Sequence, residues 1–187
     1  MLRTPSSRPD RLVGDLLVLE AMRGDRAAFE QLVAHWQERL WQHAYGLTRR
    51  DAEAWDVVQE SWIAIARGLR RLKEPQAFRA WAFMIVTRAA IALARRVRID
   101  DGARDITLEP EPALANDTDD RSQAVADLRA ALSRLDDEER ALLSLRYLEE
   151  LELTELARVF DIPVGTVKSR LHTARARLKN VLERMQR

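Results

Sequence analysis

Two helical patterns separated by a short break near the C-terminus restrict most strongly what this chain can fold into. A short helix is predicted over 153–160 and a longer one from 164 to about 184. Between them, Asp161-Ile162-Pro163 interrupts the chain, because Pro163 disfavours helical backbone at the residue before it. The second helix has an apolar stripe at Val167, Leu171, Ala174 and Leu178. This order of elements predicts a helix-turn-helix.

The outer face of that second helix is basic, although the whole chain has a formal net charge of only +1. Its cations are Lys168, Arg170, His172, Arg175, Arg177 and Lys179, against the single acid Glu183. One-sided positive charge is typical of a helix that faces phosphates. The free N–H groups near Gly165 and Thr166 can also hold a phosphate. We therefore predict that the helix enters the major groove of DNA, the alternative being a solvated hairpin with a basic face.

Composition and pattern predict an all-α protein of two small helical domains. Glycine is scarce, and Ala, Leu, Arg and Glu dominate. A disordered tail is expected over 1–11, a helical bundle over 12–98, an acidic linker over 99–122 and the helix-turn-helix domain over 123–187. The linker holds Gly102, Pro110 and Pro112 among eight acidic residues, so charge and proline keep it extended.

Several classes of protein are disfavoured. The absence of cysteine excludes disulfides and thiolate metal sites. His35, His43 and His172 are scattered, so no metal site and no cofactor are predicted. We find no signal peptide and no apolar run near the roughly 18–20 residues that span a bilayer. The expectation is a cytoplasmic protein without membrane insertion.

Periodicity in the N-terminal domain predicts long helices over 26–47, 51–68 and 75–97. The third is expected to bury Phe78, Ala82, Ile85 and Ala89, and the five tryptophans are expected mostly in the core. Two groups of residues suggest binding. Asp56, Gln59 and Glu60 share one helix face as an acidic, polar patch. The second group combines basic residues with one aromatic, which is how single-stranded nucleic acid is held: Arg67, Arg70, Arg71, Lys73, Arg79, Trp81, Arg88, Arg95 and Arg96.

The C-terminal motifs resemble region 4 of sigma-70 family initiation factors, in the extracytoplasmic-function (ECF) group. The similar segments are Leu-Asp-Asp-Glu-Glu-Arg at 135–140, Glu-Leu-Ala at 155–157 and Ile-Pro-Val-Gly-Thr-Val-Lys-Ser-Arg-Leu-His at 162–172. The resemblance implies that this domain reads the −35 promoter element. It places these residues near DNA: Gly165, Thr166, Lys168, Ser169, Arg170, His172, Thr173, Arg175 and Arg177. Many relatives have a basic residue at the position of Thr173, so the base preference is expected to differ here.

The resemblance extends to the N-terminal domain. Residues 56–62, Asp-Val-Val-Gln-Glu-Ser-Trp, look like the region 2 helix that binds the polymerase β′ coiled coil, and the β flap is the implied partner of region 4. Residues 78–81 and the loop 68–76 look like the segments that open the −10 element and capture a flipped base. Relatives usually carry Asn and Asp where this chain has Ala89 and Leu93, while Arg96 is kept. The contacts of that helix with the −10 element are therefore expected to differ from those of relatives.

The resemblance implies a promoter-specificity factor that joins core RNA polymerase to promoter DNA, with a possible anti-sigma factor as regulator and a role in stress response. The acidic linker would then thread through a basic channel of the polymerase, whereas the plain alternative is a spacer. Two other classes remain open. A free-standing helix-turn-helix regulator predicts tight binding to a palindromic site without polymerase. An enzyme would need clustered acid–base or metal residues, which the sequence does not offer.

Overall fold

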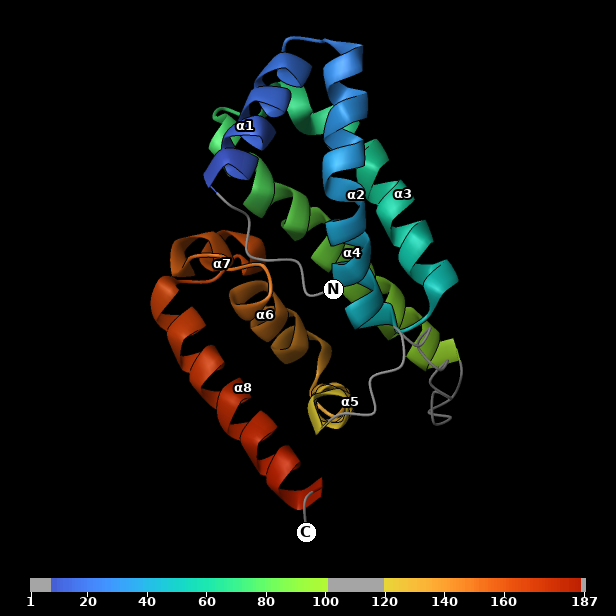
Figure 1. The fold of residues 1–187 in the computed structure, drawn as a ribbon, viewed down its shortest axis with the longest axis vertical. Helices are drawn as coiled ribbons and strands as arrows, with labels where there is room; N and C mark the ends of the chain where they lie inside the picture. The colour runs from blue at the N-terminus through green and yellow to red at the C-terminus, as the bar shows by residue number, and fades with distance from the viewer. Residues whose placement is uncertain (1–7, 101–119, 186–187) are drawn as a thin grey trace.

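The computed structural model describes residues 8–100 and 120–185, and these residues form helices only (Figure 1). The helices are α1 (Arg8–Met22), α2 (Arg26–Thr48), α3 (Asp51–Gly68), α4 (Phe78–Asp100), α5 (Asp120–Leu132), α6 (Asp137–Tyr147), α7 (Leu153–Phe160) and α8 (Val164–Met185), with the short 3-10 turns η1 (Leu69–Arg71) and η2 (Pro75–Ala77). The predicted all-α class is confirmed.

Two predicted boundaries differ from the structure. Helix α1 begins at Arg8 and not at Leu12, because Pro9 and Asp10 lie in its first turn, where both residue types are favourable. Helix α4 continues to Asp100 and α5 begins at Asp120, so the connection is shorter than the predicted linker 99–122. The remainder of the predicted tail and linker, 1–7 and 101–119, lies outside the described residues.

Helix α4 is the centre of the N-terminal domain, where it packs against α2 and α3 and also reaches α7 of the C-terminal domain (Figure 1). Because it has neighbours on several sides, its buried surface is wider than one stripe. Phe78 and Ala82 are buried as predicted, but Ile85 and Ala89 are only half-buried. Phe83, Val86 and Ala90 fill the core in their place.

The segment Pro75–Val97 is long and apolar enough to cross a membrane by length and composition, contrary to the expectation from the sequence. It is the core helix of the N-terminal domain, and much of its apolar surface is buried against α2 and α3. Packing within the protein accounts for this hydrophobicity. Among the described helices no other meets the same criteria.

The C-terminal domain confirms the predicted helix-turn-helix. Helices α7 and α8 have the predicted bounds at the break, and Asp161 takes the left-handed conformation that ends α7, with φ of 54°. Val167, Leu171 and Ala174 are buried. The acidic run at 136–139 starts α6, and Asp136 accepts a hydrogen bond from the Glu139 N–H at 2.8 Å. Leu128 of α5 has the helical spacing to share a stripe with Leu132 and Leu135, but it is exposed.

His43 is buried between α2 and α4. Its Nε2 lies 2.8 Å from Thr87 Oγ1, and the edge of its ring meets Phe83 with the ring centroids 5.4 Å apart. Burial disfavours the charged imidazolium and lowers the pKa of His43 from 6.5 to about 3. The side chain is therefore a neutral part of the core at physiological pH.

We expect His43 to make the fold sensitive to acid. Its folded-state pKa lies below its unfolded value, so its contribution to stability is complete above pH 6.5 and is lost as the pH falls toward 3. In that window the free energy of unfolding should fall by about 1.4 kcal/mol per pH unit through this group. In urea titrations at several pH values, His43→Gln should flatten the dependence of the free energy of unfolding on pH. His172→Gln, at an exposed site, should leave it unchanged, and equal slopes in all three proteins would contradict the prediction.

Candidate nucleic-acid interface

The basic residues of α8 divide between two faces. Lys168, His172 and Arg175 are exposed and follow one another at helical spacing along the outer face. Arg170 and Arg177 instead turn toward α6. Arg170 pairs with Glu138 at 3.1 Å, and Arg177 pairs with Glu139 at 2.8 Å and with Asp136 at 3.6 Å.

This division refines the prediction from the sequence. Within the part of the chain that the structure describes, no carboxylate pairs with Lys168, His172 or Arg175, so this face offers free positive charge to phosphates and base edges. The face toward α6 is partly neutralised by the acids that begin that helix. The other predicted residues lie at the start of α8 or on the same two faces: Gly165, Ser169 and Thr173 are exposed, Thr166 is half-buried, and the Ser169 hydroxyl donates to the Thr166 carbonyl.

A shallow pocket of about 270 Å³ lies between α6, α7 and α8. Its walls combine apolar side chains of Leu142, Phe160 and Ile162 with Thr173 and the paired Arg170. Thr173, where the base preference was expected to differ, therefore borders the pocket and is also exposed on α8. Ile162, in the turn between α7 and α8, also packs against the core.

The N-terminal domain brings the predicted basic loop onto Trp81. Arg70, Arg71 and Lys73 are exposed on the α3–α4 connection, and Arg67 is exposed in the last turn of α3. That helix ends at Gly68, which lies against the half-buried indole of Trp81. The Trp81 ring also meets the ring of Phe78, with centroids 6.3 Å apart. The basic connection thus begins beside an aromatic ring, a combination that suits single-strand binding.

Gly68 is a residue of this site that sequence reasoning missed. A Cβ at position 68 would lie 2.7 Å from Cζ2 of Trp81, closer than side-chain packing allows. Only glycine therefore lets the end of α3 lie directly on the indole. Its position at the end of a helix was the available signal, but the partner across the fold could not be seen in the sequence.

Replacing Gly68 with alanine should displace Trp81. The added methyl must push the indole or the helix end aside, and overpacking of this kind costs about 1–3 kcal/mol. Gly46→Ala is the matched control: nothing lies within 4 Å of its Cβ position, so a helix stabilised by up to about 1 kcal/mol is expected. For both variants, thermal unfolding would measure the change in stability. The fluorescence of Trp81, in a background where the other tryptophans are phenylalanine, would measure the displacement of the indole. A stability of Gly68→Ala equal to that of Gly46→Ala would contradict the close contact.

Two of the predicted cations lie away from Trp81. Arg79 is only two residues before it, so the helical turn points the two side chains apart, and Arg79 instead reaches Glu155 of α7 at 2.7 Å. Arg95 reaches Glu138 of α6 at 2.8 Å. Arg88 and Arg96 are exposed on α4. The predicted group therefore falls into three parts. Arg88 and Arg96 are exposed on α4, and Arg79 and Arg95 contact the C-terminal domain. The remaining members, which we call the Trp81 cluster, lie at the end of α3, on the α3–α4 connection and at the start of α4: Arg67, Arg70, Arg71, Lys73 and Trp81.

The acidic, polar patch is on the outer surface of α3. Asp56, Gln59 and Glu60 are all exposed. Beside them, a groove of about 380 Å³ runs between α2 and α3, and its lining includes Trp41, Trp55 and Val33. The Trp41 and Trp55 rings lie 5.9 Å apart. An aromatic groove next to exposed polar groups is typical of a protein interface.

No group of His, Asp and Glu able to hold a metal ion was found in the residues that the structure describes. The acids at 136–139 are used for helix capping and for ion pairs with α8. The site therefore offers charge, hydrogen-bond donors and aromatic surface for binding.

Comparison with known proteins matches both domains to one family. Residues 32–98 match the family described as Sigma-70 region 2, and residues 131–180 match Sigma-70, region 4. A solved structure of the sigma factor RpoE in complex with the anti-sigma factor NepR, from Bartonella quintana, has the same fold. Its TM-score is 0.69 at 23% identity, over 83% of this chain and 96% of that one.

Curated relatives cover nearly the whole chain. The ECF RNA polymerase sigma factor SigW of Bacillus subtilis is 27% identical over 181 residues, which are 88% of this chain and 94% of the relative. The ECF RNA polymerase sigma factor SigM of Mycobacterium tuberculosis is 31% identical over 175 residues, 94% of this chain and 87% of the relative. The chain therefore belongs to the sigma-70 family of RNA polymerase sigma factors, in the ECF group.

Proposed function

We propose that this sigma factor divides promoter recognition between its two domains, with the outer face of α8 at the −35 element and the Trp81 cluster at the −10 element. The observation that carries the proposal is the exposed basic row Lys168, His172 and Arg175 on the second helix of a helix-turn-helix. Phosphate contacts from such a row position the helix, and contacts with base edges specify the sequence.

We assign the Trp81 cluster to the separated strand. Loop arginines can hold phosphates while a base stacks on the indole, and flipping a base costs least at weak A·T steps. Helix α4 supplies Arg88 and Arg96 but has Ala89 and Leu93 where relatives usually carry polar residues. The loop therefore supplies most of the strand-capture contacts in this proposal.

The protein has no catalytic chemistry of its own in this proposal. It acts in the cytoplasm, where it brings core RNA polymerase to the promoter. Each domain makes few DNA contacts, so free affinity should be weak, and linkage on the polymerase makes the second contact effectively intramolecular. An anti-sigma factor is a proposed further partner, since a solved relative of the same fold was determined with one.

Run-off transcription with purified core polymerase tests the proposal. Sequencing transcripts after overexpression supplies the promoter for the template. The sigma factor should bind core and start transcripts at that promoter. A protein that neither binds core nor directs initiation is not acting as proposed, and tight binding to a palindromic site without polymerase would favour the free-standing regulator.

The double variant Asp56→Ala, Gln59→Ala should weaken core binding. Both side chains are exposed on α3 beside the aromatic groove, so their loss removes polar contacts without disturbing the core. Loss of interface hot-spot residues predicts about tenfold or weaker affinity, measured by fluorescence anisotropy against core polymerase. Glu20→Ala on α1 is the control, since its carboxylate pairs locally with Arg23, three residues later in the chain. Unchanged core affinity in the double variant would remove α3 from the interface.

A further inference from the structure

Helix α6 lies beside α8 (Figure 1), and the start of α6 carries three carboxylates that meet two arginines of α8. Nη1 of Arg170 lies 3.1 Å from Oε2 of Glu138. Nη1 of Arg177 lies 2.8 Å from Oε1 of Glu139 and 3.6 Å from Oδ2 of Asp136. We call Asp136, Glu138 and Glu139 the α6 acids.

The α6 acids make the two sides of α8 differ in charge. Residues two apart on a helix are separated by about 200°, so Lys168 and Arg170 lie on opposite sides. Arg175 follows Lys168 after two turns, and Arg177 follows Arg170 in the same way. Within the described ranges no carboxylate pairs with Lys168 or Arg175, whereas Arg170 and Arg177 face three carboxylates. Helix α8 therefore offers excess positive charge on one side only.

The pair of Glu139 with Arg177 has one shielded partner. The exposed fraction is 13% for the Glu139 side chain and 58% for that of Arg177. Oε2 of Glu139 is buried, and no group among the described residues donates a hydrogen bond to it. A partly buried pair is screened by salt less than an exposed one, so Arg177 stays neutralised at the ionic strength of a cell. Because the guanidinium is accessible, the carboxylate and not burial keeps it from phosphates.

Helix capping does not account for these contacts. Asp136 caps α6 by accepting from the Glu139 N–H at 2.8 Å, and acids are favourable at the start of a helix. This cap uses the side chain of Asp136 and the backbone of Glu139. The carboxylates of Glu138 and Glu139 are free of it and pair with α8 instead.

The α6 acids also border the shallow pocket between α6, α7 and α8, which Ser169 and Thr173 line as well. A DNA strand that approached α8 across this pocket would meet carboxylates beside two neutral side chains. Like charges repel, so this side of the helix disfavours phosphates. The side of Lys168 is therefore the favourable one for docking on DNA.

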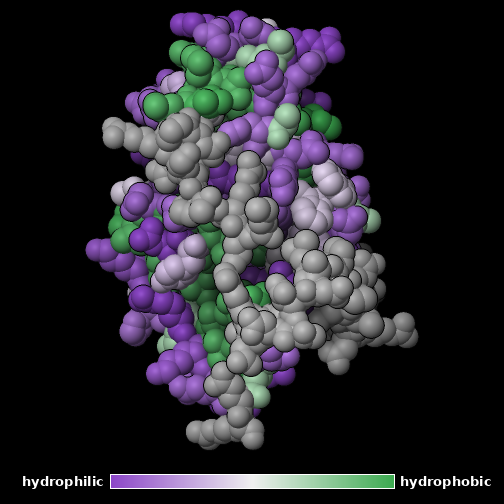
Figure 2. Space-filling view, viewed as in Figure 1, coloured by the Kyte–Doolittle hydropathy of each residue, from purple (hydrophilic) through white to green (hydrophobic). Residues whose placement is uncertain are grey.

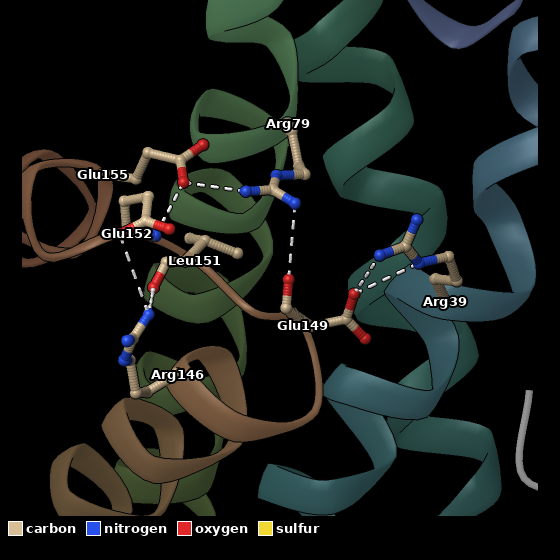
Figure 3. Close-up of polar contacts among 7 residues, drawn as sticks. All are labelled: Arg39, Arg79, Arg146, Glu149, Leu151, Glu152 and Glu155. Atoms are coloured by element: carbon tan, nitrogen blue, oxygen red, sulfur yellow. Dashed lines mark hydrogen bonds and ion pairs between the residues drawn. The ribbon is translucent and has the colours of Figure 1, made fainter. Parts of the chain in front are cut away.

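Two acids near the connection between α6 and α7 have other partners (Figure 3). Glu149 accepts from Arg39 at 2.6 Å, and Glu155 accepts from Arg79 at 2.7 Å. Both arginines belong to the N-terminal domain. The carboxylates that meet the basic second helix of the helix-turn-helix therefore come from the start of α6.

We propose that the α6 acids are specificity-determining residues, which keep Arg170 and Arg177 from phosphates and so suppress binding of the helix-turn-helix to random DNA. Contacts with phosphates stabilise binding to every sequence alike, whereas contacts with base edges discriminate. A genome holds about a million or more competing sites, so the ratio of specific to non-specific affinity decides whether a −35 element is found. The inference rests on the proposed function for the identity of that element.

Binding of the free, full-length protein to a random-sequence duplex of about 40 base pairs tests the neutralisation. Anisotropy titrations between about 50 and 200 mM KCl give the affinity and its dependence on salt. Glu139→Gln keeps a residue that suits the first turn of α6 and should release Arg177. The affinity at the lowest salt should rise about threefold. The slope of log affinity against log salt should steepen by about 0.9, the value for one added phosphate contact. Unchanged affinity and slope would overturn the proposal.

The double variant Glu139→Gln, Arg177→Gln is the matched control. It removes both members of the pair and keeps the net charge, so affinity and slope should return to the wild-type values. A slope shallower than wild type would mean that Arg177 contacts a phosphate despite Glu139, which would overturn the proposal. Glu20→Gln removes the same charge in the other domain and should leave the slope unchanged. A slope equal to that of Glu139→Gln would reveal only a general effect of charge and would also overturn it.

Specificity is measured with the holoenzyme, as initiation from the promoter found by transcript sequencing relative to the same promoter with a scrambled −35 element. The double variant Glu138→Gln, Glu139→Gln should lower this ratio by about threefold or more, because the freed arginines favour both templates. Arg95→Gln should leave it unchanged, since it removes the other partner of Glu138, at 2.8 Å, without freeing a cation of α8. An unchanged ratio in the double variant would overturn the role in specificity. A wild-type holoenzyme that does not distinguish the two templates would instead count against the proposed function, and the salt dependence of the free protein would still test the neutralisation.

Discussion

Replacing Arg175 with alanine is expected to lower promoter-directed initiation by about tenfold or more while leaving the affinity for core polymerase unchanged, since a specific base contact contributes about 1–3 kcal/mol. Arg175 lies on the exposed outer face of α8, one turn after Leu171, whose carbonyl accepts from its Nε at 3.3 Å. That contact orients the side chain along the helix, with most of the guanidinium left for DNA. The measurement is run-off transcription at saturating core, together with core binding by anisotropy.

Two variants on the same helix sharpen this prediction. Lys179→Ala removes an exposed cation one turn farther from the start of α8, where it pairs with Glu183 at 3.7 Å, and should have little effect. Arg170→Ala should lower initiation by a smaller factor than Arg175→Ala, because Glu138 already neutralises Arg170. A loss of core binding in Arg175→Ala, or equal losses in all three variants, would contradict the assignment of the outer face.

Local chemistry made the helix-turn-helix predictable. Pro163 and the apolar spacing after it determine where α7 ends and α8 begins, and both lie within a few residues of the break. The capping of α6 by Asp136 was visible for the same reason. The orientation of Arg79 away from Trp81 could also have been obtained from the helical repeat alone.

Contacts between distant segments could not be read from the sequence. Arg39 and Glu149 are 110 residues apart, and nothing in their local patterns marks them as partners. The same holds for Gly68 under Trp81, which depends on how closely α3 and α4 approach. Leu128 fits a helical stripe but remains exposed, since a stripe is buried only where another helix covers it.

The apolar surface of α1 is a further example. Leu12, Val13 and Leu16 are exposed. Figure 2 shows hydrophobic surface at the upper end of the molecule, the end at which α1 lies in Figure 1. The other side of this amphipathic helix buries Val18 and Ala21, and the helix packs against α2. Which side of an amphipathic helix remains uncovered depends on the tertiary arrangement.

Replacing Trp81 with alanine should impair initiation on duplex promoters by about tenfold, because stacking of a base on an aromatic ring contributes about 1–3 kcal/mol. The loss should be smaller on a template whose −10 strands are mismatched, since unpairing no longer has to be driven by base capture. The ratio of the two activities is the measurement, with the same promoter in both templates. It cancels any general loss of active protein.

Trp81 also packs against Phe78 and Gly68, so a folding defect must be separated from strand capture. Trp81→Phe keeps an aromatic face and should retain most of the duplex activity, whereas Trp81→Leu fills similar space without a ring that can stack. If Trp81 captures a base, Trp81→Leu should have the same ratio of duplex to mismatched-template activity as Trp81→Ala, although Trp81→Leu is more stable to heat. If packing is the role, activity should follow thermal stability, and both templates should lose equally.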